Sequence, residues 1–297
     1  MELWIKVFEV ILPVIIVILT GFCFGKVTNV NLKPVNLLLL YISTPCLIFS
    51  SLMDGKITME AAYQILIAGT LMIFTAMVLF SGILKILKKN ISTFLNPLVF
   101  PNTANMALPI ALYAFGNEAF EYAIIFTTLV FFYHCSVGIF ILNGRDKIME
   151  VFKTPLIYAV SLALLLNNNE IKVHVGLNNA INLLGTTSIP LMMFSLGHKL
   201  SETKIVNLNE NLLLSSFRLL IGSALGYSIC AILGVHGMIA KVMILQFSMP
   251  SAVFNFILSD RYNKSPEKVA SLVFVSTVLS IIFIPIILYL LMKQDAS

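Results

Sequence analysis

Long apolar runs separated by short polar stretches follow one another along almost the whole chain. A helix that crosses a bilayer needs about 20 mostly apolar residues. By that criterion the pattern predicts ten spans, with little chain left between them for a separate soluble domain. The predicted bounds are 4–25, 34–53, 61–84, 94–115, 119–142, 149–167, 177–198, 211–233, 238–260 and 268–291.

The composition agrees with this pattern. Of the 297 residues, 59% are hydrophobic and only 11% are charged, whereas about 25% are charged in an average soluble domain. Apolar surface on this scale cannot be hidden in one core, which predicts an integral, all-helical membrane protein in contact with the lipid bilayer. The basic residues behind the net charge of +5 lie in short connections, so we expect no nucleic-acid partner.

The distribution of lysine and arginine predicts the orientation. The loops after odd-numbered spans hold thirteen of the 19 basic residues, the opposite face and the termini hold five, and Arg218 lies within a span. Because positive loops stay in the cytoplasm, this asymmetry places both termini outside in a multi-pass protein of the cell (inner) membrane.

The two halves of the chain also resemble each other. Pro45 in STPCLIFSSL aligns with Pro190 in SIPLMMFSLG, and Pro101 aligns with Pro250 at a similar shift. Two repeats of five spans must enter the membrane from opposite sides because five is odd. The sequence therefore predicts two inverted five-helix repeats, 1–142 and 143–297, which is a common plan of secondary transporters.

Two predicted spans carry proline in their middle. The span at 94–115 contains FPNTANMALPIAL, with Pro101 and Pro109, and the span at 238–260 contains LQFSMPSAVFNFIL, with Pro250. Proline removes a backbone donor, and broken backbone at membrane depth is tolerated only inside protein or beside a cavity. We therefore expect broken helices 4 and 9 to cross near the midplane, each offering free N–H groups and the positive end of its dipole.

Amide and hydroxyl side chains beside these breaks can hydrogen-bond a carboxylate without adding negative charge. The sequence thus predicts a binding site for a small organic anion at the crossing. The alternative is that the prolines only kink their helices while the polar side chains join neighbouring spans. The predicted substrate-binding residues are Asn102, Thr103, Asn105, Pro109, Gln246, Pro250, Ser251 and Asn255.

Two further residues are candidates for an electrostatic or coupling role. Arg218 is the one basic residue that lies well inside a predicted span. Its side chain either reaches the membrane interface or a helix end, or it attracts an anionic substrate. His134 lies in the middle of a span and is either a proton relay or a hydrogen-bonded core residue. No span interior contains Asp or Glu, which counts against a carboxylate relay.

The broken spans are similar to those of a known family. PNTANMALPIAL and MPSAVFNFILSDRYNKSPEKVASLVFVSTVLSIIFIPIIL resemble spans 4 and 9–10 of the auxin efflux carrier family, and TPLIYAVSLALLL and SIPLMMFSLGHKL resemble spans 6 and 7. That family includes bacterial organic-acid permeases and the plant PIN-type carriers. The resemblance covers most of the chain.

The resemblance implies a fold similar to that of bile-acid/sodium symporters, with an elevator-like movement of a transport unit against a scaffold. It also implies substrate contact at Asn102, Pro109 and Pro250. Ala104 and Ala107 stand where the family often has glycine. The long loop of the plant members after span 5 is absent, so auxin specificity is not transferred.

The sequence favours a transporter over an enzyme. It contains no HExxH, GxSxG or P-loop motif, and its four cysteines lack metal-ligand spacing. We therefore expect no cofactor and no metal site, with Na⁺ or H⁺ left open as coupling ion and a homodimer left open as assembly. The alternatives are a sodium-coupled organic-anion symporter and a membrane ligand sensor without net transport.

Overall fold

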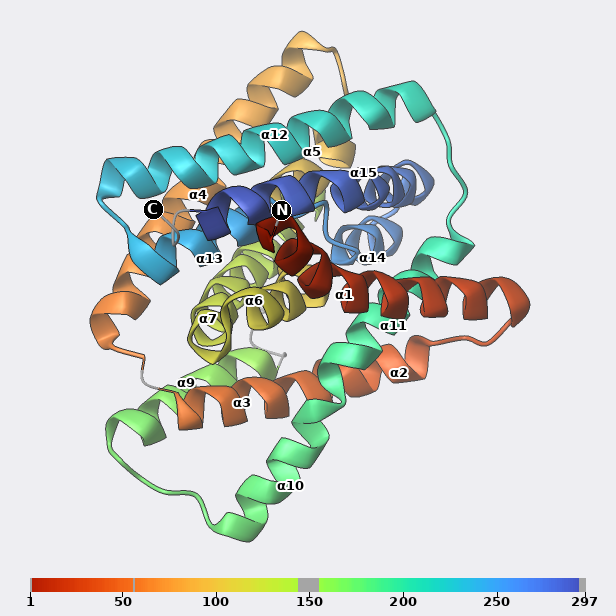
Figure 1. Ribbon diagram of the computed structural model, residues 1–297. Helices are drawn as coiled ribbons and strands as arrows, with labels where there is room; N and C mark the ends of the chain where they lie inside the picture. Colours follow the sequence, from red (N-terminus) through yellow and green to blue (C-terminus); the bar gives the residue numbers. More distant parts are fainter. Residues whose placement is uncertain (1, 56, 144–154, 294–297) are drawn as a thin grey trace.

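The computed structural model describes residues 2–55, 57–143 and 155–293. Within these ranges the chain forms helices joined by short connections (Figure 1). The helices of the first half are α1 (Glu2–Val27), α2 (Lys33–Leu38), η1 (Leu39–Ser43), α3 (Thr44–Asp54), α4 (Met59–Ile86), α5 (Ile91–Val99), η2 (Thr103–Ala107), α6 (Leu108–Phe115), α7 (Asn117–Tyr133), η3 (His134–Gly138) and α8 (Ile139–Asn143). Those of the second half are α9 (Pro155–Asn168), α10 (Val175–Thr186), α11 (Ser188–Glu202), α12 (Leu208–Leu233), α13 (Gly237–Phe247), α14 (Phe254–Arg261) and α15 (Pro266–Lys293).

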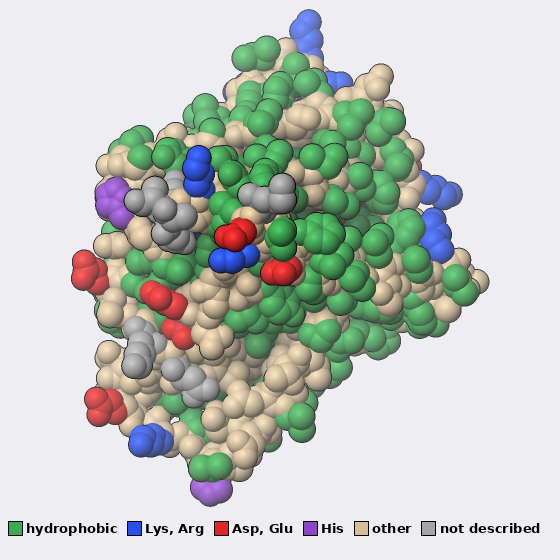
Figure 2. All heavy atoms as spheres, in the orientation of Figure 1, with side chains coloured by type: hydrophobic (Ala, Val, Ile, Leu, Met, Phe, Trp, Pro, Cys, Tyr) green, Lys and Arg blue, Asp and Glu red, His purple; other side chains and the backbone are tan. Residues whose placement is uncertain are grey.

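Seven helical stretches in the described ranges are long and apolar enough to cross a membrane. Four are the single helices α1, α4, α12 and α15, and three are continuous runs of consecutive helices, from α2 to α3, from α7 to α8 and from α10 to α11. Large apolar side chains remain exposed on them, as for Val78 and Ile232, which are 73% and 78% exposed. Figure 2 shows hydrophobic side chains over much of one face. The protein is therefore a multi-pass membrane protein.

Three predicted spans do not appear as one long helix. The span at 94–115 is divided after α5, and the span at 238–260 is divided after α13. In both cases the interruption coincides with the proline that the sequence analysis singled out. The span at 149–167 begins outside the described residues, and its described part is the shorter helix α9. Ten spans in two inverted repeats stay a prediction.

The helices associate in two groups. The panel group consists of α1, α2–α3, α9 and α10–α11, in which α1 packs along α11 and α3 packs against α9 and α10. The crossing group consists of α4 to α8 and α12 to α15, in which α7 contacts α4, α6 and α13, and α12 contacts α4, α13 and α15. Figure 1 shows the crossing group behind and above the panel group. The groups touch where α1 meets α6 and α15, where α11 meets η2, and where α7 meets α3 and α9.

Close backbone packing joins the panel group. A Cβ atom added to Gly21 of α1 would lie 2.8 Å from the carbonyl carbon of Phe194 in α11, and one added to Gly197 would lie 2.8 Å from the carbonyl carbon of Ile18. Each glycine therefore lets the facing backbone approach. Small residues serve this purpose in membrane helices, where packing replaces the hydrophobic effect as the driving force.

Candidate functional site

The two interrupted stretches lie against each other in the interior of the protein. Pro101 opposes Ser251 as in one step of an antiparallel sheet. Beside this pair, the N–H of Asn102 donates a hydrogen bond of 2.7 Å to the carbonyl oxygen of Pro250. All four residues are buried. The breaks thus form a crossing whose backbone groups bond to each other.

The sequence analysis expected unpaired N–H groups here, and for three residues that expectation is wrong. The N–H of Ala252 donates to the carbonyl oxygen of Phe100 at 3.2 Å, and the N–H of Ser251 donates to Oγ of Ser276 in α15 at 3.2 Å. Together with Asn102, these donors are already used. The reason is that an unpaired buried backbone group costs as much as a lost hydrogen bond, so each break satisfies the other.

The side chain of Asn102 retains a free donor. Its Nδ2 atom is buried without a hydrogen-bond partner in the described part of the chain, and the residue is only 3% exposed. Thr103, which follows it, is also buried, whereas Asn105 is half-buried. Asn102 is therefore the predicted site residue that most clearly offers an N–H to a guest.

Asn255 offers the opposite chemistry. Its Nδ2 atom lies within hydrogen-bond distance of the carbonyl oxygens of Phe100, at 3.2 Å, and Ala252, at 3.0 Å, while its Oδ1 atom has no partner among the described residues. Backbone carbonyls only accept, so they fix which end of the amide carries the NH₂ group. Asn255 therefore holds the crossing together and keeps a buried acceptor, and its side chain lies near the imidazole of His134.

The side-chain amides of Gln246 and Asn96 are oriented in the same way as that of Asn255. Nε2 of Gln246 donates to the carbonyl oxygen of Ala123 in α7 at 3.0 Å, and Nδ2 of Asn96 in α5 donates to the carbonyl oxygen of Gly138 at 2.8 Å. Their amide oxygens are buried without partners in the described ranges. Sequence reasoning missed Asn96, although it lies in the same apolar run one turn before the first break.

Pro109 does not break its span, whereas its contact with substrate stays a prediction. The break itself lies at Pro101, and Pro109 is the second residue of α6, directly after the wide π-helical turn η2. A π-helical turn inside a helix accommodates a residue that lacks its N–H. The prediction that Pro109 interrupts the span is thus wrong, because Thr103–Phe115 forms one helical stretch.

His134 connects both broken stretches. Its ring stacks on Phe100 at 4.3 Å between centroids and meets the edge of Phe254 at 5.1 Å. Phe100 ends the first half of one broken span, and Phe254 begins the second half of the other. The residue is 3% exposed, and its Nε2 atom has no partner in the described ranges. His134 therefore packs the crossing from the side of α7 and η3.

Arg218 of α12 makes a helix-end contact and does not reach the interface. Its Nη2 atom donates to the carbonyl oxygen of Phe247 at 2.9 Å, and its guanidinium lies 5.1 Å from the ring centroid of the same residue. Phe247 ends α13, where the helix dipole carries partial negative charge. The side chain is 1% exposed, and Nε and Nη1 have no partner among the residues described.

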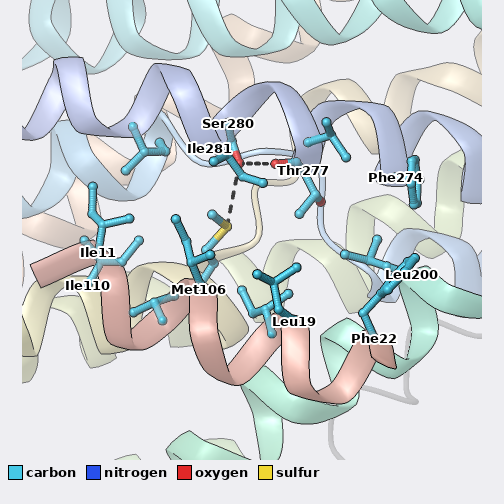
Figure 3. A pocket seen from close by; sticks show the side chains of 15 residues that line it. Ile11, Leu19, Phe22, Met106, Ile110, Leu200, Phe274, Thr277, Ser280 and Ile281 are labelled. Atoms are coloured by element: carbon cyan, nitrogen blue, oxygen red, sulfur yellow. Dashed lines mark hydrogen bonds between the residues drawn. The ribbon is translucent and has the colours of Figure 1, made fainter. Parts of the chain in front are cut away.

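A cavity of about 210 Å³ is lined by residues of α1, η2, α6, α11 and α15. Figure 3 shows it between α1 and α15, with Met106 of η2 at its base. Thr277 and Ser280 contribute hydroxyl groups, but Oγ1 of Thr277 donates to the carbonyl oxygen of Val273 at 2.8 Å, and Oγ of Ser280 donates to that of Thr277 at 2.7 Å. The atoms that the cavity wall presents are apolar.

Comparison with known proteins decides the family. Residues 6–288 match the sequence profile of a family described as "Membrane transport protein". The chain belongs to that family. This confirms the resemblance to the auxin efflux carriers, which are members of it.

Two archaeal relatives of this transporter are also similar over long stretches. An uncharacterized transporter of Methanocaldococcus jannaschii is 25% identical over 301 residues, which cover 93% of this chain and 96% of that protein. An uncharacterized transporter of Methanothermobacter thermautotrophicus is 28% identical over 192 residues, 62% of this chain and 63% of that protein. Family and relatives are membrane transporters, not enzymes.

The transporter thus gathers half of its predicted substrate-binding residues at one place. Hydrogen bonds and the pairing of the two breaks bring four of the eight together at the crossing, namely Asn102, Pro250, Ser251 and Asn255. Among the described residues, no group of three His, Cys, Asp or Glu side chains could hold a metal ion. The arrangement offers a buried amide donor beside several buried amide acceptors, which suits binding of a polar guest rather than covalent chemistry.

Proposed function

We propose that this protein is a secondary transporter that carries a small organic anion, a carboxylate, across the cell membrane. The observation that carries the proposal is the crossing, where two broken helices meet and Asn102 keeps an unused donor in the interior. An N–H group in a site that excludes water binds an anion far more strongly than it does in water. Thr103 and Ser251 add buried hydroxyl groups.

The buried positive charge of Arg218 is a second argument that the substrate is an anion. Its guanidinium is buried in α12, and none of the ion pairs described for the chain includes it. A buried charge without an acidic partner raises the electrostatic potential around it, because the interior screens charge poorly. Arg218 contacts the end of α13 through the carbonyl oxygen of Phe247. The positive potential therefore lies next to the second break.

We infer that the two halves are inverted repeats related by a pseudo-twofold axis. Adding 150 to the donor number and subtracting 150 from the acceptor number turns the bond from Asn102 to Pro250 into the bond from Ala252 to Phe100. Self-complementary contacts of this kind are expected where a twofold axis passes through an interface. The reciprocity supports five spans in each repeat.

Contacts between equivalent residues in the panel group also support the repeat. Oγ1 of Thr44 lies 3.0 Å from Oγ of Ser188, and Oγ1 of Thr187 lies 3.1 Å from Oγ of Ser43. Both pairs are separated by 144 residues. These residues belong to the stretches that the sequence analysis aligned through Pro45 and Pro190. The panel group and the crossing group thus each carry one pair of equivalent segments in contact.

The proposed mechanism is an elevator movement. The crossing group would slide along the panel group and expose the crossing first to one side and then to the other. The division into two groups of helices supports this mechanism, because backbone hydrogen bonds bind the crossing internally, whereas the contact with α1 is largely apolar. Apolar surfaces slide without breaking directional bonds. Rigid-body movement of one bundle against another is the usual form of alternating access.

The distribution of charge supports an outside location for both termini. Figure 2 shows the visible Asp and Glu side chains at the left and in the centre, together with some Lys and Arg, whereas the charged side chains along the top and right edges are Lys and Arg. Figure 1 places the end of α1 and the connection between α11 and α12 at the right. Under the positive-inside rule the right edge is cytoplasmic. A negative interior then drives an anion outward with ~2.3 kcal/mol per charge per 100 mV.

Flux into proteoliposomes tests the proposal. Purified protein is reconstituted, and uptake of labelled mono- and dicarboxylates is measured under imposed voltage, proton and sodium gradients. Asn102→Ala removes the free donor and is expected to abolish carboxylate movement. The matched control is Asn169→Ala, which changes an exposed asparagine at the end of α9. Circular dichroism confirms that both variants remain folded.

Two results would count against the proposal. Wild-type flux in Asn102→Ala would remove the crossing as the binding site. Absence of carboxylate flux in the wild type under every gradient would remove the transport function itself. Carboxylate binding without flux would instead favour a membrane sensor.

The sodium-coupled symporter is the second candidate. The observation that favours it is the set of three amide oxygens, on Asn96, Gln246 and Asn255, that have no partner among the described residues. Oxygen atoms of this kind, with carbonyls of unwound backbone, coordinate Na⁺ in transporters with broken helices. Carboxylate uptake that stops when Na⁺ is replaced by choline would select this candidate. Uptake that persists in choline would exclude it.

A further inference from the structure

We propose that the guanidinium of Arg218 is a fixed cation at the second break, so that this transporter moves its anion without a co-transported cation. The inference rests on the proposed function, because it concerns the positive charge that balances a carboxylate at the crossing. It goes further by assigning that charge to a side chain of the carrier, whereas other carriers with broken helices take it from a bound Na⁺ or H⁺.

The end of α13 is where such a cation would bind. The last four carbonyl oxygens of a helix have no N–H partner within it, and they carry the negative end of its dipole. At α13 the three oxygens before that of Phe247 accept from the backbone N–H groups of Ser248 and Met249. The oxygen of Phe247 accepts from Nη2 of Arg218 at 2.9 Å. The guanidinium therefore binds the carbonyl oxygen that the backbone at the break leaves over.

Packing around α12 leaves room for the guanidinium. Gly222 lies one turn after Arg218, and a Cβ atom added to it would lie 2.6 Å from Nη1 of Arg218 and 2.5 Å from the carbonyl oxygen of Phe247. The ring centroid of Phe247 lies 5.1 Å from the guanidinium, and the face of an aromatic ring attracts a cation. A glycine, a ring and a helix end thus form a site for a planar cation.

The described part of the chain provides no carboxylate to balance this charge. Arg218 is 1% exposed, and the described ion pairs do not include it. On α12 and on the helices packed against it, which are α4, α5, α13 and α15, the acidic residues lie in first turns. Glu60 and Glu267 are exposed there, and Glu210 pairs with Lys89. An anion at the crossing is therefore the counter-charge of Arg218.

The crossing lies close enough for this charge to act on it. Phe247 precedes Pro250 by three residues, and consecutive Cα atoms are about 3.8 Å apart, so at most about 11 Å of chain separates them. Charges attract each other over such distances in a protein interior, because the interior screens them poorly. A carboxylate at the crossing therefore balances Arg218 without touching it.

The fixed cation travels with the binding site. α12 packs on α4, α13 and α15, which all belong to the crossing group. In the elevator movement a monovalent anion and Arg218 together add no net charge to the moving group, whereas the empty group keeps one positive charge. The membrane potential then acts on the return of the empty carrier. No second ion has to bind before the loaded carrier moves.

Chemical rescue tests the inference. Arg218→Ala removes the guanidinium, and uptake of labelled pyruvate and succinate into proteoliposomes is measured at equal pH on both sides. We expect uptake to fall by about tenfold, which is a typical strength of coupling between two sites. Guanidinium chloride at millimolar concentration should restore it. Urea has a similar planar shape and N–H groups but no charge, and at the same concentration it should restore nothing.

The charge and its position have separate controls. Arg218→Lys keeps a cation at the same position and should retain most of the uptake without additives. Arg261→Ala removes an arginine at the exposed end of α14 and should show wild-type uptake with and without guanidinium. A merely structural role of Arg218 would let urea, which fills the same space, rescue uptake as well as guanidinium does.

A measurement on the wild type decides the case where Arg218→Ala does not fold. Exchange of labelled for unlabelled pyruvate or succinate is measured with Na⁺, K⁺ or choline as the only added cation, each with and without a pH difference. We expect the same rate under all these conditions, because the required cation is part of the carrier.

The failures of the two proposals can be told apart. Wild-type uptake in Arg218→Ala, equal rescue by urea and guanidinium, or wild-type exchange that requires Na⁺ or a pH difference would overturn this inference while carboxylate transport stands. A requirement for Na⁺ would select the sodium-coupled symporter. No uptake and no exchange of either carboxylate by the wild type would overturn the proposed function, and this inference with it.

Discussion

The backbone N–H of Asn102 donates a hydrogen bond of 2.7 Å to the carbonyl oxygen of Pro250, which lies in the other half of the chain. The proline that breaks one helix thereby accepts from the residue that follows the proline of the other. Because Pro101 and Ser251 face each other beside this bond, the two breaks support one another. The crossing should therefore behave as one rigid unit.

A cross-link at the crossing tests this rigidity. Opposed residues of an antiparallel pair that do not bond to each other have Cα atoms about 4.5 Å apart, which a disulfide can bridge. We expect Pro101→Cys/Ser251→Cys, in a chain whose own cysteines are replaced by alanine, to form a disulfide on oxidation. The oxidised and reduced forms should transport at the same rate. Flux that disappears on oxidation and returns with a reductant would show that the crossing opens during transport.

Loss of the Arg218 side chain should destabilise the crossing group. Arg218→Met leaves the carbonyl oxygen of Phe247 without its charged donor, and hydrogen bonds to charged groups contribute about 1.5–3 kcal/mol. We expect the melting temperature followed by circular dichroism to fall by several degrees, and carboxylate affinity to fall with it. Arg218→Lys should recover part of both losses. Arg261→Met, at the exposed end of α14, is the control.

The glycine contacts between α1 and α11 should tolerate no side chain. Gly21→Ala and Gly197→Ala each place a methyl group against the facing backbone, and overpacking of this kind costs about 1–3 kcal/mol. Gly82→Ala in α4 meets no atom within 4 Å and should stabilise the helix by about 0.5–1 kcal/mol. Thermal denaturation of the three variants measures both the expected loss and the expected gain of stability. An unchanged melting temperature in Gly21→Ala would show that the helices can separate without cost.

The sole tryptophan of the chain can report movement between the two groups. Trp4 of α1 stacks on Tyr289 of α15, with 4.4 Å between ring centroids and 14° between planes. If α15 slides along α1, this stack must break. We expect a carboxylate substrate to change the emission of Trp4 in the wild type but not in Asn102→Ala, which cannot bind it. No change on addition of a transported substrate would argue against elevator movement at this contact.

The apolar periods of the sequence were sufficient to place the long helices. Runs such as 4–25, 61–84 and 268–291 lie within α1, α4 and α15, each of which extends two residues further at both ends. Backbone groups have no water to bond in a bilayer, so an apolar run of this length has few options other than a helix. The positions of the helix breaks were also predictable from the local sequence. Pro101 and Pro250 lack a backbone N–H, whatever the position of the rest of the chain.

The sequence alone could not decide how the polar groups are shared. Asn102, Gln246 and Asn255 are similar residue types beside similar breaks, and all were expected to donate to an anion. Only the fold shows that the NH₂ group of Gln246 donates to the carbonyl oxygen of Ala123 and that the NH₂ group of Asn255 donates to the backbone of the crossing. It also shows that Asn102 retains a free donor. These partners lie more than a hundred residues away along the chain for Gln246 and for the Phe100 contact of Asn255.

What the sequence by itself determined is therefore local: which segments are helical, which carry a break, and which family the residues resemble. Tertiary structure decided that the breaks satisfy each other's backbone, that Arg218 ends on Phe247, and that an apolar cavity lies between α1 and α15. The physical reason is the range of each interaction. Helix formation depends on neighbours a turn away, whereas hydrogen-bond partners and cavities depend on segments that only folding brings together.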